Sequence, residues 1–291
     1  MTRPRSWISL IAATAFLAGL SRAAGAQTYT VVLSVNDARP MAEAVLSLIR
    51  TYPVTITYED PRYEYAGDLH DVARQVSKTP HPPFRSIGPR GGALQATYDV
   101  SEETGAPLDM AAAIQSVVDA NNLARFGGHF EVRQSGATFH VVPTEVRDGK
   151  GRWVPQQSLL DAPITFSSGG NKDGFGLIEA ILREVSAASG ERIVGGRPAI
   201  AINCTSPGCI ENERVVDATN EPARDVLMQL VSSLNPRYTW LLYYDAAERR
   251  YYFNLVLGVE RGQTKNEHPR PRPPKPGDPT PGQRAPPANA A

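Results

Sequence analysis

The sequence predicts an α+β fold of two tandem small units, each a helix pair packed on a short mixed or antiparallel sheet with a terminal hairpin. Two observations support this prediction. Amphipathic helices and short strands follow one another in the same order over residues 40–142 and again over residues 159–257. The 291 residues, less an N-terminal export signal and a proline-rich tail, leave two domains near the common domain size.

The N-terminal segment has the pattern of an export signal. Arg3 and Arg5 precede an apolar run at 8–20 that is too short to span a bilayer as a helix, and small residues follow at 24–26. This pattern predicts a cleavable signal peptide, the alternative being an uncleaved anchor helix. We therefore expect a periplasmic or secreted protein, with no transmembrane segment in the mature chain.

The chain divides into four parts. The C-terminal part alternates proline with basic residues and has almost no apolar bulk, which predicts a disordered tail with polyproline II character. It is either a solvated tail or an extended basic arm that contacts the cell wall or a partner. The boundaries that we assign are 1–26 for the signal peptide, 27–143 for the first unit with an insert at 60–92, 144–257 for the second unit, and 258–291 for the tail.

The first unit opens with a predicted helix from Pro40 to about Thr51, whose apolar residues recur at three- and four-residue spacing. Pro53 ends this helix, and residues 54–58 alternate as a strand. After the insert, a strand at 93–100 leads into a second helix at 107–122. A hairpin around Ser135-Gly136 closes the unit.

The two faces of this hairpin differ in character. One face is apolar and consists of Phe130, Val132, Phe139 and Val141. The other face is polar and consists of His129, Glu131, Arg133, Thr138 and His140. We expect the polar face to meet water, as one face of an antiparallel sheet commonly does. The alternative is a metal or acid–base site formed by His129, Glu131 and His140.

The second unit repeats this order. Its predicted elements are a strand at 159–166, a helix at 175–189, strands at 192–194 and 214–219, a helix that ends at Pro236, and a hairpin of residues 238–244 and 249–257. Asn220 is the expected N-cap of the last helix, with Pro222 in its first turn.

Both faces of the second hairpin are apolar or aromatic. With a turn at Ala246-Ala247, one face holds Trp240, Leu242, Tyr251 and Phe253, and the other holds Leu241, Tyr243 and Tyr252. One face can pack on the helices of its own unit, so the other needs a cover from the first unit or from another molecule. Tyr243 and Tyr252 are therefore candidate binding residues, because tyrosine is enriched at interfaces.

The chain has two cysteines, Cys204 and Cys209, on either side of a Ser-Pro-Gly turn. In an oxidising compartment we expect them to form a disulfide bond that holds one loop. The alternatives are a redox pair or half of a metal site. A redox pair is disfavoured because the spacing is not C-x-x-C. A metal site is disfavoured because two thiolates leave the tetrahedral coordination of zinc incomplete.

The insert at 60–92 is the best place to look for a specific site, since long loops in compact domains are often functional. Its candidate binding residues are Tyr63, Tyr65, Asp68, His70 and Asp71. Asp68, His70 and Asp71 could ligate a divalent metal or act as acid and base. The alternative is a structural loop in which the tyrosines cover a sheet edge.

The charge and the absence of known catalytic motifs exclude several classes of function. The formal net charge is zero, which argues against nucleic acid as a partner. The sequence has no G-x-S-x-G, no H-E-x-x-H and no phosphate loop. We therefore expect no catalytic residues, no bound metal and no cofactor. The hypothesis is a non-enzymatic module that contacts a protein or a cell-envelope component; the alternative is an envelope enzyme or metal-dependent binding protein that uses the insert.

Parts of the sequence resemble a known family. The matching segments are Arg39–Val45 (RPMAEAV), Val54–Tyr58 (VTITY), Arg214–Thr219 (RVVDAT) and Glu221–Leu227 (EPARDVL). In their order they resemble the secretin and TonB short N-terminal domain, and Trp240–Tyr244 looks like uncharacterised exported bacterial proteins of similar layout. The resemblance implies a periplasmic module that makes protein contacts in secretion or uptake machinery. The family pattern lacks the insert at 60–92.

Overall fold

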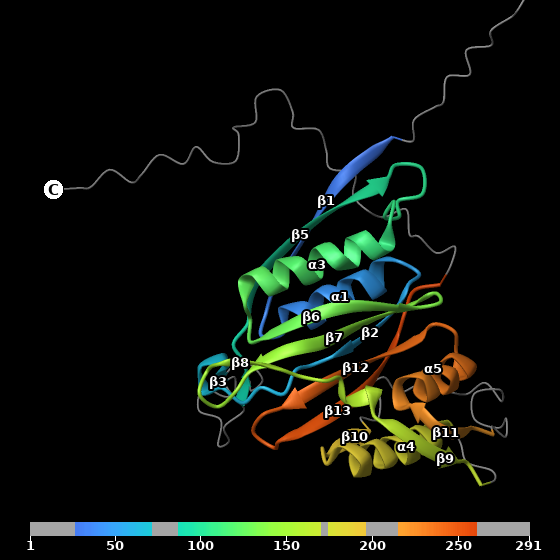
Figure 1. Cartoon of the computed structure of the whole chain (residues 1–291). Coiled ribbons are helices and arrows are strands. Elements are labelled where there is room, and N and C mark those ends of the chain that lie inside the picture. The colour runs from blue at the N-terminus through green and yellow to red at the C-terminus, as the bar shows by residue number, and fades with distance from the viewer. Residues whose placement is uncertain (1–26, 72–86, 170–173, 196–214, 261–291) are drawn as a thin grey trace, which may run out of the picture.

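The computed structural model describes residues 27–71, 87–169, 174–195 and 215–260. Within these ranges the chain forms four α-helices and several β-sheets (Figure 1), which confirms the predicted mixed α+β class. No helix in the described ranges is both long enough and apolar enough to cross a membrane. The predicted signal peptide, the Cys204–Cys209 disulfide and the tail beyond residue 260 lie outside the described residues.

The first half of the chain contains β1 (Thr28–Asp37), α1 (Pro40–Thr51), β2 (Thr55–Glu59), η1 (Ala66–Asp68), β3 (Leu69–Asp71), β4 (Ile87–Pro89), β5 (Gly92–Ser101), α3 (Met110–Ala124), β6 (Gly128–Ser135) and β7 (Thr138–Arg147). Pro40 starts α1, where its missing N–H costs nothing. Asp109 caps α3 by accepting a hydrogen bond from the Ala112 N–H at 3.1 Å. The strand β1 was not predicted, although its sequence TYTVVLSVND is rich in β-branched residues.

The second half contains β8 (Trp153–Pro155), η2 (Leu159–Asp161), β9 (Pro163–Ser167), α4 (Gly174–Ser189), β10 (Ile193–Gly195), β11 (Asp217–Pro222), α5 (Ala223–Leu234), β12 (Tyr238–Asp245) and β13 (Arg250–Leu257). The predicted strand at 159–166 is wrong in its first part, where η2 forms a tight turn. Asn220 is not the N-cap of α5: its φ of 55° lies in the left-handed region, and Pro222 holds the cap position. Asn220 sits at an irregularity in the pairing of β11 with β9, and asparagine tolerates this conformation.

One mixed sheet runs through both halves of the chain. Its strand order is β10-β13-β12-β2-β7-β6, with β8 added beside β7. The join between the halves is a short parallel pairing in which Leu241 lies opposite Tyr58 and Leu242 opposite Glu59. The expected arrangement had a separate small sheet in each half. Pairing of β12 with β2 instead removes an open edge from each half.

Two hydrophobic cores lie on opposite faces of this sheet. The first involves α1, α3 and the side chains of Ile56, Tyr58 and Val141. The second involves α4, α5 and the strands β9 and β11. In Figure 1, α1 and α3 lie above the sheet and α4 and α5 below it. The sheet is therefore covered by one helix pair on each face.

The faces predicted for the second hairpin are confirmed by its register. Leu242 lies opposite Phe253 and Tyr243 opposite Tyr252. Side chains alternate along β12, so Trp240 and Leu242 join the second core, whereas Leu241 joins the first. The second apolar face is thus covered by the first half of the chain, one of the two covers that were considered.

Outside the main sheet, β1 and β5 form a two-stranded antiparallel ribbon. The ribbon packs against α1 and α3 and extends beyond them at the top of Figure 1. Leu94, Ala96 and Val100 of β5 face inward and are buried. The strands β9 and β11 form a second ribbon beside α4 and α5.

Candidate functional site

Two carboxylates, Glu59 and Asp60, follow each other at the end of β2, and neither has exposed surface. Burying an ionised carboxylate is unfavourable unless other groups bond to it. Both carboxylates accept hydrogen bonds from donors of the second half of the chain, where the two halves meet.

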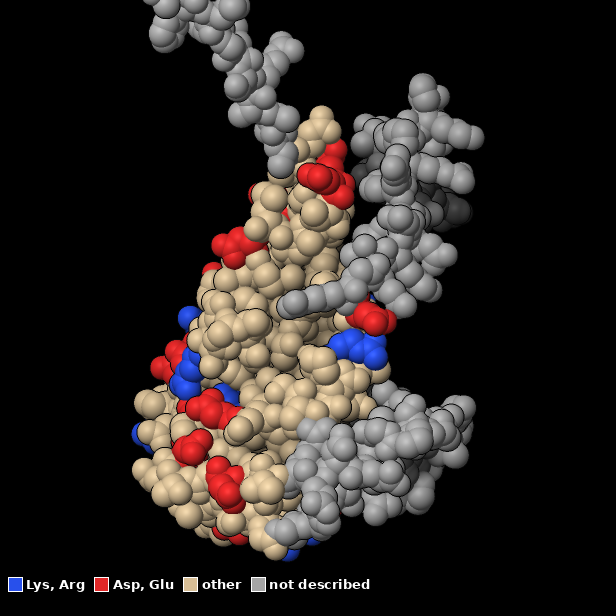
Figure 2. All heavy atoms as spheres, turned by 90° about the vertical axis from the view of Figure 1, so that its right-hand side faces the viewer, with Lys and Arg blue, Asp and Glu red and all other residues tan. Residues whose placement is uncertain are grey.

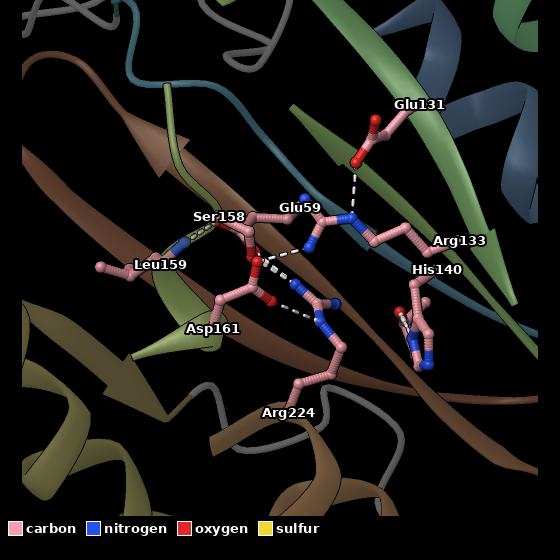
Figure 3. A network of polar contacts seen from close by, with 9 residues as sticks. Glu59, Glu131, Arg133, His140, Ser158, Leu159, Asp161 and Arg224 are labelled. Carbon is pink, nitrogen blue, oxygen red and sulfur yellow. Dashed lines mark hydrogen bonds and ion pairs between the residues drawn. The ribbon is translucent and has the colours of Figure 1, made fainter. Parts of the chain in front are cut away.

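Glu59 is enclosed by donors from the second half (Figure 3). The Ser158 hydroxyl donates to Oε2 at 2.6 Å and the Leu159 N–H donates to Oε1 at 2.5 Å. Nη2 of Arg224, on α5, donates to Oε2 at 3.1 Å and also contacts the Ser158 hydroxyl. Both oxygens of Glu59 are therefore satisfied by η2, by the residue before it and by α5.

The network continues from Arg224 to the first hairpin. Arg224 Nε donates to Asp161 at 3.2 Å, and Arg133 Nη1 donates to the other oxygen of Asp161 at 2.5 Å. Arg133 also donates to Glu131 at 2.5 Å. Figure 3 shows these side chains as a continuous chain of contacts, which we call the junction network. It links β2 and β6 of the first half to η2 and α5 of the second.

The junction network changes the acid–base behaviour of its carboxyls. Burial raises the pKa of Glu59, while the Arg224 guanidinium and the Ser158 and Leu159 donors oppose that rise. Burial also acts to raise the pKa of Asp161. There the Arg133 hydrogen bond and the Arg224 charge outweigh burial, so that the pKa lies below its ordinary value. Because Glu59 has no exposed surface, it is placed to hold the halves together rather than to meet a substrate.

His140, on β7, lies on the same face of the sheet as Glu59 and is also buried, with 3% of its surface exposed. Its Nδ1 lies 2.8 Å from the Thr57 hydroxyl. Burial, followed by the nearby Arg224 charge, lowers its pKa to about 4. The expectation that this polar face meets water is therefore wrong for His140, because the second half of the chain covers that part of the face.

The alternative for this face, a metal or acid–base site of His129, Glu131 and His140, does not form. His129 contacts Glu145 at 2.7 Å and stacks on Trp153 with a centroid distance of 4.1 Å. Glu131 pairs with Arg133 and His140 with Thr57. Among the described residues, no three His, Cys, Asp or Glu side chains come together so that they could hold a metal ion.

Asp60 forms a second link between the halves. Tyr58 OH donates to Oδ1 at 2.7 Å, and Arg39 Nε donates to Oδ2 at 2.8 Å. The Tyr244 N–H of β12 donates to the same Oδ2 at 2.9 Å, and the Tyr244 carbonyl accepts from Arg39 at 2.8 Å. A buried carboxylate thus bonds the backbone of β12 beside the join with β2.

The candidate residues of the insert lie in two places. Tyr63 is buried and its hydroxyl lies 3.5 Å from Asp60. Asp68 is buried and pairs with Arg147 at 3.0 Å, and the Arg147 guanidinium lies 5.5 Å from the centroid of the Tyr65 ring. Burial raises the pKa of Asp68, against the charges of Arg147 and Arg90.

His70 and Asp71 belong to β3, which pairs antiparallel with β4: His70 lies opposite Gly88 and Asp71 opposite Ile87. The structure thus places them in a short ladder next to η1, while the Asp68 carboxylate pairs with Arg147. The part of the insert from 72 to 86 lies outside the described residues.

The two hairpin tyrosines are partly buried. The Tyr243 ring lies under the Arg39 guanidinium, 5.2 Å from its centroid, and burial raises the pKa of this tyrosine. The Tyr252 hydroxyl donates to Glu248 at 3.1 Å, and Arg250 lies 4.8 Å from its ring centroid. Both tyrosine side chains therefore contact other side chains of this chain.

Sequence reasoning missed Glu59, Asp60 and Arg224, although weak signals were present. Arg224 lies on the apolar stripe of α5, three residues before Leu227. An arginine on a buried stripe indicates a buried partner, since arginine is almost never fully buried unless paired. The partner itself is not predictable from spacing, because Glu59 is distant in the sequence.

The β1–β5 ribbon has a further feature, an open edge along β1. The two strands pair without a bulge from Thr28 opposite Ser101 to Asp37 opposite Gly92. The Gln27 carbonyl accepts from the Glu102 N–H at 2.9 Å, so odd-numbered residues of β1 bond to β5. Even-numbered residues direct their N–H and C=O groups to the other side, where no strand of the described chain pairs with them: Thr28, Thr30, Val32, Ser34 and Asn36.

Comparison of the chain with protein-family models, with curated proteins and with solved structures finds no match.

Proposed function

We propose that this chain is an exported, non-enzymatic interaction module of the cell envelope, which binds a protein partner by strand addition to the open edge of β1. We further propose that it consists of two tandem α+β units that resemble the secretin and TonB short N-terminal domain. The observation on which the proposal rests is the β1 edge itself. Strand addition uses backbone groups for affinity, so it needs a long edge with free N–H and C=O groups.

The character of β1 supports this role. Proteins usually protect edge strands with lysine, proline or a bulge. Over its ten residues β1 has no lysine, no proline and no bulge, and its charged residue is Asp37 at the end. The side chains of Thr30, Val32 and Ser34 are exposed. An unprotected edge of this length favours pairing with another strand.

The strand pairings support the tandem part of the proposal. In the first half β1 pairs antiparallel with β5, β2 pairs parallel with β7, and β6 and β7 form a hairpin. In the second half β9 pairs antiparallel with β11, β10 pairs parallel with β13, and β12 and β13 form a hairpin. A helix follows the first strand of each ribbon and another follows the second. Duplication of one unit accounts for this agreement.

The non-enzymatic part is supported by what the reactive groups do. Glu59, Asp60 and Asp68 are buried and bonded to side chains or backbone of this chain. The alternative, an enzyme or metal-dependent binder that uses Asp68, His70 and Asp71, has less support because Asp68 is paired with Arg147.

Photo-cross-linking in the producing cell tests the proposed function. A photoreactive residue at Ser34 should yield a cross-link to an envelope protein, whereas one at the exposed Glu184 on α4 should not. In the same protein, Val32→Pro removes an N–H that points away from β5, so it should abolish the cross-link and leave the ribbon folded. Val32→Thr keeps that N–H and should preserve the cross-link. Equal cross-linking by the proline and threonine variants would contradict strand addition.

A further inference from the structure

The inner face of the β1–β5 ribbon is less well covered under β1 than under β5. Residues that lie directly opposite each other on the two strands share a face. Three opposite pairs lie on the inner face: Tyr29 with Val100, Leu33 with Ala96, and Val35 with Leu94. The β5 member of each pair is buried, whereas Leu33 and Val35 are only partly buried and Tyr29 is 39% exposed.

A strand added to β1 would extend this inner face. Its residues opposite Leu33 and Val35 would lie beside them and cover their exposed part. Apolar side chains at those positions would be favoured, because cross-strand apolar pairs stabilise a sheet and remove apolar surface from water. The inner face therefore selects a strand with an apolar residue at every second position.

The residues between those positions would lie on the outer face. They would be opposite Thr30, Val32 and Ser34, whose backbone N–H and C=O groups point away from β5. These three side chains are exposed, and so is Asp99, which lies opposite Thr30 and accepts a hydrogen bond from its hydroxyl at 2.7 Å. The outer residues of an added strand would thus be polar, and the charge around β1 decides their sign.

The part of the molecule around β1 carries charge of one sign. We call it the acidic arm: residues 27–38 and 92–124, which comprise β1, β5, the connection to α3, and α3. It contains no lysine, arginine or histidine, and its charged residues are Asp37, Asp99, Glu102, Glu103, Asp109 and Asp119. Figure 2 shows this upper end of the molecule with acidic side chains and without a basic one on the face in view.

The helix α1, which packs against β1, does not offset this charge. Its own arginine, Arg50, lies 3.5 Å from the carboxylate of Glu43. Arg39, which precedes the helix, is paired with the buried Asp60 at 2.8 Å. Both cations are therefore matched by a carboxylate, and the acidic arm attracts basic groups.

Other edges near the acidic arm are bonded by the chain itself. The side-chain amide of Asn122, on α3, accepts from the Phe130 N–H and donates to the Phe130 carbonyl, both at 2.9 Å, so it covers part of the outer edge of β6. On the far edge of β5, the Leu108 N–H donates to the Asp99 carbonyl at 3.0 Å. Along β1, no strand of the described ranges takes this place.

We infer that the β1 edge binds an extended segment of a partner protein in which apolar residues alternate with lysine or arginine. The apolar residues cover the inner face beside Leu33 and Val35, and the basic residues lie on the outer face within the field of the acidic arm. A second copy of the chain is disfavoured as the occupant, because it would bring a second acidic arm against the first. This inference rests on the proposed function, to which it adds the chemistry of the partner.

NMR titration of the full mature chain tests the inference with two synthetic peptides, Lys-Val-Lys-Val-Lys-Val-Lys and Glu-Val-Glu-Val-Glu-Val-Glu. The lysine peptide should protect the N–H groups of Thr30, Val32 and Ser34 from exchange, and bind at least about tenfold more tightly than the glutamate peptide in about 10 mM salt. This preference should shrink in about 1 M salt, where the screening length is about 3 Å. Val32→Pro should abolish binding of the lysine peptide, and Val32→Thr should retain it.

The inner face has its own test. A third peptide, Lys-Ser-Lys-Ser-Lys-Ser-Lys, keeps the charge and the backbone but has no apolar side chains. We expect it to bind at least about fivefold more weakly than the lysine–valine peptide, because Leu33 and Val35 would stay uncovered. Equal affinity of these two peptides would contradict the role given to the inner face.

The acidic arm is tested by neutralising three exposed carboxylates near the first residues of β1 with the variant Asp99→Asn, Glu102→Gln and Glu103→Gln. In about 10 mM salt this variant should bind the lysine–valine peptide about tenfold more weakly, since three modest charge interactions are lost together. The matched control neutralises three exposed carboxylates on α4 and α5: Glu179→Gln, Glu184→Gln and Asp225→Asn. It removes the same net charge and should change the affinity by less than about twofold.

Four results would overturn the inference. They are the absence of binding by the lysine–valine peptide, equal affinity for the lysine–valine and glutamate peptides, equal loss in the two triple variants, and binding that survives Val32→Pro. Protection of the Val32 N–H that is present without peptide and falls on dilution would identify a second copy as the occupant instead. A chain that binds the lysine–valine peptide at β1 but gives no cross-link from Ser34 in the cell would contradict the proposed function alone.

Discussion

Glu59 and Arg224 show at the scale of single residues how the two halves are held together. Glu59 is fully buried and bonds to Ser158, Leu159 and Arg224, all from the second half. A buried ion pair of this kind contributes little relative to apolar residues of the same shape, but loss of one partner leaves the other charged and unpaired. Its effect is therefore best measured by removing one side at a time.

Replacement Arg224→Met should lower the free energy of unfolding by about 3–5 kcal/mol, because Glu59 would stay buried without its cation. Urea unfolding of the mature chain measures this value. Adding Glu59→Gln to Arg224→Met should recover part of the loss, since no buried charge remains. Arg183→Met on the exposed face of α4 is the control and should change stability by less than about 0.5 kcal/mol. A loss below about 1 kcal/mol for Arg224→Met would show that the pair is not a structural link.

His140 should make the protein less stable in mild acid. Its ordinary pKa of 6.5 falls to about 4 in the folded protein, owing to burial and then to Arg224 and Arg133, with Asp161 opposing. Between these values the unfolded chain binds more protons than the native one, so the free energy of unfolding falls as the pH drops from about 6.5 to about 4.

The variant His140→Gln cannot take up this proton. We expect its free energy of unfolding to fall less steeply than that of the wild type over the same pH range, as measured by urea unfolding at a series of pH values. The opposite trend from the raised pKa of Glu59 is common to both proteins and cancels in the comparison. Parallel profiles would contradict the assignment to His140.

At the scale of elements, close backbone approach positions the ribbon. Gly91 lies between β4 and β5, and a Cβ placed there would lie 2.1 Å from the Asp37 carbonyl oxygen and 2.5 Å from that of Ala38. These are backbone atoms at the end of β1, so they cannot move without shifting the strand. Glycine at this position therefore allows the end of β1 to lie against the start of β5.

Gly91→Ala should lower the free energy of unfolding by about 1–3 kcal/mol, the usual cost of forcing an extra methyl group into a closed space. Gly149→Ala is the matched control, since a Cβ there meets nothing within 4 Å. Thermal unfolding followed by circular dichroism compares the two. Equal melting temperatures would show that the end of β1 adjusts freely.

At the scale of the whole molecule, one sheet with a helix pair on each face makes the halves interdependent. Leu241 belongs to the second half but is buried in the first core with Ile56 and Tyr58. The Thr239 hydroxyl donates to the Ile56 carbonyl at 2.5 Å and the Asp60 N–H to the Leu242 carbonyl at 2.8 Å. These contacts join the halves by backbone pairing, core packing and buried charge together.

The mature chain should therefore unfold in one transition. With Trp153 replaced by phenylalanine, tryptophan fluorescence reports on Trp240 in the second core, and far-ultraviolet circular dichroism reports on the whole chain. We expect the two unfolding midpoints to coincide. Leu241→Ala should shift both midpoints together and lower the free energy of unfolding by about 2–5 kcal/mol. Leu257→Ala removes an exposed side chain and should have little effect. Separate midpoints would mean that each half folds independently.

The sequence alone determined the local elements, because periodicity and chain breakers act over short ranges. Stripes of apolar residues identified the four described helices, and alternation identified both hairpins with the correct faces. Where local signals competed, the prediction failed: the tight turn at Leu159 was taken for a strand, and Asn220 for a cap. The strand β1 was missed despite a suitable composition.

Which elements share a sheet, and what the polar residues contact, depend on long-range packing that local sequence patterns do not specify. The parallel pairing of β12 with β2 joins residues far apart in the sequence, and no spacing rule relates Leu242 to Glu59. The same is true of Glu59 with Arg224 and of His140 with Thr57. Alternation along the first hairpin predicts a solvent-facing side chain for His140, yet it is buried. The physical reason is that alternation specifies two faces of a strand, whereas burial of each face depends on which distant segment packs against it.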